Sequence, residues 1–149
     1  MKRGIWKVLA AVVVVTAGVT LIALPRNAEW TTSSPEALRE FEAAMEAQTK
    51  LYHAEAQAHL ERAIELDPDF VIAKLQYRGY SHGDKERANR LVEEVLNADL
   101  GGLTPREQFM IERFRLLTEE RGDEAEALLD SYLEAYPNDP WVVYTKAME

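Results

Sequence analysis

The chain has 149 residues, about the length of one domain. It contains no cysteine, which excludes disulfide bonds, cysteine-ligated zinc and iron–sulfur clusters. The net charge is −9 and is unevenly distributed: before position 26 the charged residues are Lys2, Arg3 and Lys7, whereas the rest of the chain carries 14 basic and 26 acidic residues. Such an acidic body argues against binding to nucleic acid, whose phosphates require clustered Lys and Arg, and against broad contact with an anionic membrane surface.

Residues 1–25 predict a segment directed to a membrane. No charged residue occurs from Val8 to Pro25, and these eighteen residues would span ~27 Å as a helix, close to the hydrocarbon thickness of a bilayer. Trp6 and Trp30 flank the run, as aromatic residues do at membrane interfaces. We expect a single transmembrane anchor. The alternative is a cleaved secretory signal, whose small-residue cleavage site would be Thr16–Gly18.

The charges on either side of this run predict its orientation. Three basic residues precede it, whereas Arg26 and then acidic residues follow it. Because basic flanks stay in the cytoplasm, we expect a cytoplasmic N-terminus and an extracytoplasmic body. In a bacterium this places the protein in the inner membrane with its body in the periplasm.

After a linker at residues 26–33, the chain from 34 to 149 consists almost wholly of helix-forming residues. Ser33, Pro35 and Glu36 have the spacing of a capped helix start, and Thr104, Pro105 and Glu107 repeat it. Helix-breaking residues recur at positions 49–50, 67–68, 82–84, 101–102, 121–123 and 137–140. No segment alternates apolar and polar residues for long enough to predict a strand, so we expect an all-α domain.

One pattern recurs three times with the same offsets of 4, 7 and 12 residues. A small residue that allows close helix contact is followed by two residues on the same helical face and then by a residue at the helix end. The three occurrences are Ala56-Leu60-Ala63-Pro68, Ala88-Val92-Val95-Leu100 and Ala125-Leu129-Tyr132-Pro137. Their starts are 32 and 37 residues apart, around the 34-residue period of a helix-turn-helix repeat.

The stretches that carry this pattern, AEAQAHLERAIELDPDF (54–70), GDKERANRLVEEVL (83–96) and GDEAEALLDSYLEAYPNDP (122–140), resemble the tetratricopeptide repeat (TPR) family. The likeness is strongest to TPR arrays attached to bacterial signalling and transcription proteins. It implies a helix-turn-helix solenoid of about three repeats plus a partial fourth, with a groove that binds a partner protein or peptide. Two residues depart from the family pattern: Leu100 replaces the usual proline, and Arg78 replaces a small residue, which predicts a looser contact in the second repeat.

By analogy with the family, one stripe on the first helix of each pair would face the groove. The stripes are Phe41, Met45 and Gln48; Leu75, Gly79 and His82; and Met110, Phe114 and Leu117. The alternative is that these residues belong to the ordinary core, as apolar residues at helical spacing usually do. The acidic charge of the domain favours a basic or neutral partner.

The residue pattern favours a non-catalytic function with no cofactor and no metal. His53 and His59 are six residues apart and so lie on different faces of a helix, and His82 falls in a predicted turn. No glycine-rich phosphate loop is present. We expect a membrane-tethered interaction scaffold. The alternative is an extracytoplasmic sensory or regulatory TPR fragment of a longer signalling protein.

The last predicted helix is unusually apolar for the end of a solenoid, which normally has a polar outer face. Trp141, Val142, Tyr144 and Met148 predict an exposed patch there. We expect this patch to be covered by a second copy of the chain, by a partner, or by residues of a longer natural chain.

The uncharged run at residues 8–25 gives the first prediction. The protein should stay with the membrane fraction after carbonate extraction and should keep its original N-terminus, because an anchor is neither stripped nor cleaved. Mass spectrometry of the extracted protein tests both points. A soluble product, or a mature chain that begins near Val19, would contradict the anchor.

Overall fold

A computed structural model describes residues 29–80 and 84–147. The apolar run Val8–Pro25 and His82 lie outside these residues, so the anchor stays a prediction. Among the helices that are described, none combines the length and the apolar character needed to cross a membrane.

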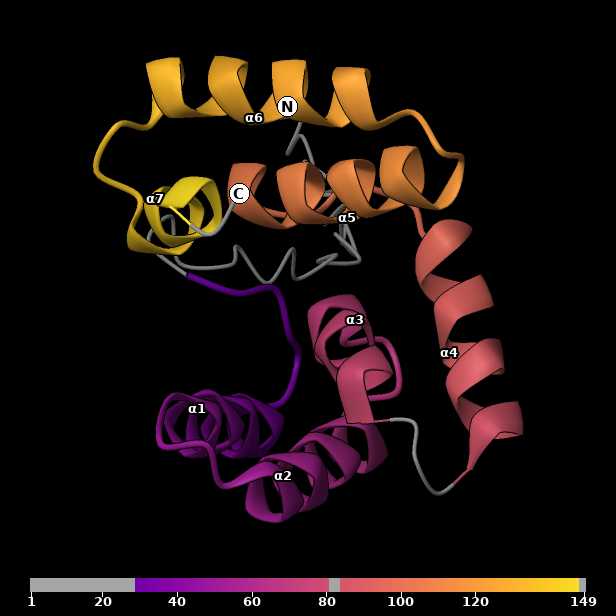
Figure 1. The fold of residues 1–149 in the computed structure, drawn as a ribbon. Coiled ribbons are helices and arrows are strands. Elements are labelled where there is room, and N and C mark those ends of the chain that lie inside the picture. The colour runs from indigo at the N-terminus through magenta and orange to yellow at the C-terminus, as the bar shows by residue number, and fades with distance from the viewer. Residues whose placement is uncertain (1–28, 81–83, 148–149) are drawn as a thin grey trace, which may run out of the picture.

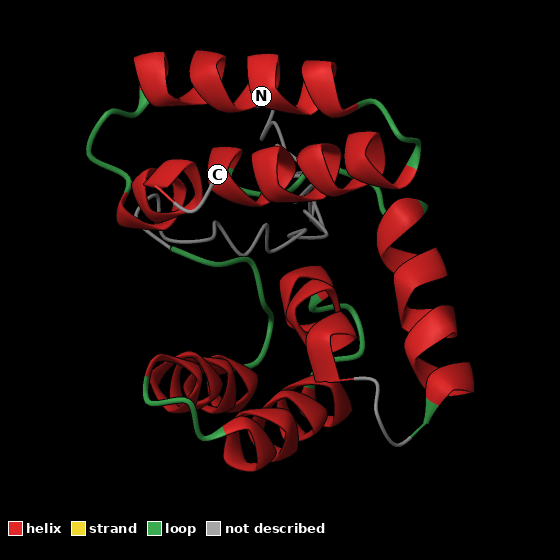
Figure 2. Cartoon of the chain, in the orientation of Figure 1, coloured by secondary structure: helices red, strands yellow, loops and turns green. Residues whose placement is uncertain are grey.

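The described chain is all-α, as predicted, and Figure 2 shows helices joined by loops. The helices are α1 (Pro35–Thr49), α2 (His53–Leu66), α3 (Val71–Tyr77), the 3-10 helix η1 (Arg78–Tyr80), α4 (Lys85–Leu96), α5 (Pro105–Thr118), α6 (Gly122–Ala135) and α7 (Pro140–Ala147). The predicted breaks at 67–68 and 101–102 lie between helices, whereas those at 49–50, 121–123 and 137–140 overlap a helix end by one or two residues. Of the break predicted at 82–84, residue 84 is described and lies between η1 and α4.

One of the two predicted helix starts is confirmed and the other is displaced by a residue. At α5 the hydroxyl of Thr104 accepts a hydrogen bond from the Glu107 amide (3.3 Å), and the Glu107 carboxylate accepts one from the Thr104 amide (2.8 Å), which is a complete capping box. At α1 the cap is Ser34, whose hydroxyl accepts from the Ala37 amide at 3.1 Å. The prediction of a cap at Ser33 is wrong because Ser33 instead donates to the Asp67 carboxylate.

Consecutive helices pack in pairs, α1 with α2, α3 with α4 and α5 with α6 (Figure 1). The first and third pairs share the same connection, 69 residues apart. Each first helix ends in a left-handed residue, Leu51 (φ 62°) or Glu120 (φ 60°). In each case the next amide then bonds five residues back, Tyr52 to Ala47 and Arg121 to Leu116, both at 2.9 Å. This Schellman geometry gives both pairs the same tight turn.

The second pair departs from the other two at Arg78. Helix α3 has seven residues and gives way to η1 at this position, where the family pattern has a small residue. The side chain of Arg78 donates to the Leu75 carbonyl at 2.8 Å and stacks over the Phe114 ring of α5, with 4.7 Å between guanidinium and ring centroid. Gly79 is exposed, and a Cβ there would meet nothing within 4 Å, so this glycine does not serve a close helix contact.

Residues 29–34, the strap, cross from α5 and α7 to the start of α1 (Figure 1). The Trp30 ring is buried and packs edge-on against Phe41 of α1 and Trp141 of α7, at centroid distances of 5.2 and 5.6 Å. The amide and hydroxyl of Thr31 each donate to the Glu107 carboxylate at 2.6 Å. The strap therefore joins the first helix pair directly to α5 and α7, and residues 29–33 of the predicted linker pack on the helices.

The small residues of the repeat pattern lie inside the domain. Ala56, Ala88 and Ala125 are 0, 4 and 1% exposed. The buried residues form two clusters, and Ala56 belongs to the larger one. The larger one includes Phe41, Leu60 and Phe70, and the smaller one consists of Phe109, Leu129, Tyr132 and Val142.

The predicted exposure of the last helix needs correction. Val142 is 1% exposed because α7 packs against α6 and directs this side chain into the smaller cluster. Trp141 is half-buried against Trp30, and the neighbouring Val143 is the exposed valine, at 45%. The side chain of Tyr144 and the whole of Met148 lie outside the description, and self-association through this end stays a prediction.

The burial of Ala56 gives the second prediction. Ala56→Leu should lower the free energy of unfolding by about 1–3 kcal/mol, because the added atoms overpack the contact between α1 and α2. Urea unfolding of the detergent-solubilised full chain measures this. The matched control is Ala58→Leu on the exposed face of the same helix, which should change stability by no more than ~0.5 kcal/mol. Equal effects of the two substitutions would show that the repeat register is wrong.

The buried carboxylate of Glu107 gives the third prediction. Glu107→Ala should cost about 3 kcal/mol of unfolding free energy, because the amides of Thr31 and Thr104 lose their acceptor. Glu55 occupies the same helical position in α2 but is exposed, so Glu55→Ala is the control and should cost a few tenths of a kcal/mol at most. A small loss at Glu107 would mean that the strap is not held through this carboxylate.

Candidate interaction cavity

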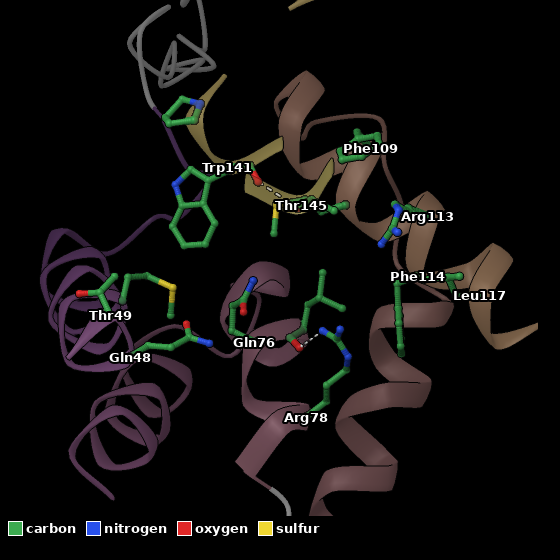
Figure 3. A pocket seen from close by; sticks show the side chains of 14 residues that line it. Gln48, Thr49, Gln76, Arg78, Phe109, Arg113, Phe114, Leu117, Trp141 and Thr145 are labelled. Carbon is green, nitrogen blue, oxygen red and sulfur yellow. Dashed lines mark hydrogen bonds between the residues drawn. The ribbon is translucent and has the colours of Figure 1, made fainter. Parts of the chain in front are cut away.

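A cavity of about 720 Å³ opens between α1, the α3–η1 segment, α5 and α7 (Figure 3). Its walls are apolar for the most part, with amide, hydroxyl and guanidinium groups between the apolar residues. The lining residues are Met45, Gln48 and Thr49 of α1; Leu75, Gln76 and Arg78 of α3 and η1; Phe109, Met110, Arg113, Phe114 and Leu117 of α5; and Pro140, Trp141 and Thr145 of α7.

Helical periodicity explains how so few elements supply so many lining residues. Positions three or four apart share a helix face, so Met45, Gln48 and Thr49 project together from α1. On α5 the rows Phe109–Arg113–Leu117 and Met110–Phe114 run side by side along one face. Trp141 and Thr145 are one turn apart on α7, where the Thr145 hydroxyl donates to the Trp141 carbonyl at 2.9 Å.

Six of the nine residues predicted for the groove line this cavity. They are Met45, Gln48, Leu75, Met110, Phe114 and Leu117. Phe41 does not: it is fully buried between Trp30 and Phe70, so the core interpretation holds for this residue. Gly79 is exposed outside the cavity, and His82 lies outside the described residues. The role of the six residues in binding stays a prediction.

Sequence reasoning missed several wall residues, for two different reasons. Phe109 and Arg113 continue the stripe already predicted on α5, so a wider stripe would have included them. Trp141 and Thr145 join the wall because α7 lies beside α5 and the strap, which no local pattern reveals. The sequence marks Arg78 as a departure from the family pattern but does not predict that it lines a cavity.

The electrostatic character of the cavity differs from that of the whole chain. Among the described residues that line it there are two arginines and no Asp or Glu. Arg78 as a residue is exposed, but its guanidinium is shielded by Phe114 and held by the Leu75 carbonyl. Burial, and after it the positive charge of Arg113, lower the pKa of Arg78. An arginine still keeps its proton at neutral pH, so both groups present positive charge.

The two described histidines lie apart from this cavity. The Nδ1 atom of His59 is 2.7 Å from a carboxylate oxygen of Glu40, and the ring of His53 lies 6.2 Å from that of Tyr80. Within residues 29–80 and 84–147, no three His, Asp or Glu side chains are grouped so as to hold a metal ion.

No protein-family model, curated protein or solved structure matches this chain. The likeness to the TPR family therefore remains a prediction from the repeat pattern.

Proposed function

We propose that the protein is a non-catalytic interaction scaffold that holds a segment of a partner protein in the cavity and is tethered to a membrane by its N-terminal residues. The observation that carries this proposal is the convergence of six residues, chosen by helical register, on one cavity. A volume of about 720 Å³ lies within the range of pockets that bind ligands.

The chemistry of the wall suits a peptide chain. Met45 and Met110 are flexible and polarisable, so they can adapt to different apolar side chains. Gln48 and Gln76 offer amide groups to a peptide backbone. Leu117 is 46% exposed and Gln48 is partly exposed, so a peptide in solution can reach this side of the cavity.

The repeated turns support a TPR-like solenoid of three helix pairs and a partial fourth. The first and third pairs have the same left-handed turn residue and the same five-residue-back hydrogen bond at a spacing of 69 residues, close to two repeat lengths. The connections that follow also agree, because Phe70 bonds to Asp67 and Asp139 bonds to Tyr136, both at 3.1 Å.

The strap would keep this domain close to the membrane. The predicted anchor ends at Pro25, and Trp30 is already buried on the helices. Five residues reach at most about 18 Å when fully extended. With the orientation expected from the flanking charges, the cavity would then lie within a short distance of the extracytoplasmic membrane surface.

One observation favours the second candidate, a sensory or regulatory domain. Trp141 lines the cavity and also contacts Trp30 of the strap, so a ligand that displaces Trp141 would disturb the residues next to the predicted anchor. The two candidates differ in a measurable respect. In a sensor, ligand binding changes the hydrogen exchange of the strap amides, whereas in a scaffold the strap is unaffected.

Site-specific photo-crosslinking tests the scaffold and is the fourth prediction. A photoreactive residue at Leu117, expressed in the full chain in its native host, should give a discrete protein adduct because this position borders the cavity. Leu66 is a matched control, since it is 41% exposed against 46% for Leu117 but lies outside the cavity.

A cavity-blocking variant completes this test. Gln48→Trp should abolish the Leu117 adduct by filling the cavity, while circular dichroism and thermal unfolding confirm the fold. No adduct at Leu117, or the same adduct from Leu66, would contradict a partner held in the cavity.

A further inference from the structure

The described residues that line the cavity differ in charge from the domain around them. The chain after residue 25 carries 26 acidic and 14 basic residues, yet the described lining contains Arg78 and Arg113 and no carboxylate. Net charge predicts how a partner approaches from a distance, but short-range contacts decide what docks. The residues of the cavity wall can therefore favour a different partner charge from the one that the outer surface favours.

We propose that the cavity recognises an amphipathic partner segment with one acidic side chain beside a bulky apolar one. The carboxylate meets the guanidinium of Arg78, and the apolar side chain lies against Met45, Met110 and Phe114. Because the outer surface repels further negative charge, the segment is neutral or basic apart from this acidic residue. This inference rests on the proposed function and specifies the partner's chemistry.

The arrangement of Arg78 is suited to this role. Its guanidinium is fixed on one side by the bond to the Leu75 carbonyl and on one face by the Phe114 ring. No carboxylate of the described residues forms an ion pair with it, whereas Arg106 pairs with Glu29 and Asp139, and Arg121 pairs with Glu119 and Glu124. A positioned guanidinium binds a carboxylate with little further loss of side-chain freedom.

The two arginines reach the cavity from different elements. Figure 3 shows Arg78 rising from the η1 side and Arg113 projecting from α5, with Phe114 close to both. Burial is the main cause of the lowered pKa of Arg78, so its guanidinium has lost part of its hydration. A bound carboxylate would offset that loss, and an apolar peptide without an acidic residue would not.

Selection from a random dodecapeptide display library tests the proposal. The bait is the full chain in lipid nanodiscs, as the natural protein, as Arg78→Glu, and as Arg90→Glu. The last variant makes the same charge change at an exposed position outside the cavity. The natural protein and Arg90→Glu should both enrich peptides with Asp or Glu next to Leu, Ile, Phe or Met. Binding of the selected peptides to Arg78→Glu should be at least about tenfold weaker.

A charge exchange makes the readout independent of folding defects. Replacing the acidic residue of a selected peptide by Lys should abolish binding to the natural protein and restore binding to Arg78→Glu. Enrichment of peptides without an acidic residue, or equal losses in Arg78→Glu and Arg90→Glu, would overturn the inference.

The same selection separates this inference from the proposed function. Peptides that lose binding in Gln48→Trp but lack an acidic residue would sustain a partner site in the cavity and refute its preference for a carboxylate. If no selected peptide is sensitive to Gln48→Trp, the cavity is not a peptide site, and both proposals fail.

Discussion

The arrangement of the helices depends on a single buried carboxylate. Glu107 is fully buried, and in a chain with a large excess of acidic residues such burial is unfavourable unless every oxygen is satisfied. Its two oxygens accept from the amide and hydroxyl of Thr31 and from the amide of Thr104. One side chain therefore caps the start of α5 and holds the strap. Because the cavity lies between α1 on one side and α5 and α7 on the other, this interaction helps to set its width.

A second network of hydrogen bonds connects the start of α7 to the start of α5. Arg106, next to Glu107, donates to Glu29 of the strap at 2.6 Å and to Asp139 at 2.7 Å. Asp139 in turn accepts from the Trp141 amide at 3.1 Å, at the first turn of α7, and from the Tyr132 hydroxyl at 3.0 Å. Burial and then this hydrogen bond raise the pKa of Tyr132 to about 12, so its hydroxyl stays a donor at physiological pH. The position of Trp141 in the cavity wall thus follows from the start of α5.

Features that depend on neighbouring residues were predictable from the sequence, and features that depend on distant ones were not. The helix breaks, the Thr104 capping box and the buried small residues at Ala56 and Ala125 follow from local spacing. Helical periodicity also selected six cavity residues, because a stripe stays on one face whatever covers it. The strap shows no periodicity, and its contact from Thr31 to Glu107 joins residues 76 positions apart. The prediction that Phe41 faces the groove is wrong for the same reason, because the strap places Trp30 against this side chain.

In a simple array of helical repeats each unit contacts its neighbours alone, so the relative position of the first and third units can vary as the array flexes. Here the strap bonds to Asp67 at the end of α2 and to Glu107 in α5, and this connection bypasses the short α3 of the second pair. A contact that joins the first helix pair to α5 of the third pair limits such flexing and keeps the walls of the cavity in place before any ligand arrives. Preorganisation of this kind lowers the ordering cost of binding. The segment that makes the contact also follows directly on the predicted membrane anchor, so the residues that would tether the domain are the same residues that hold its cavity open.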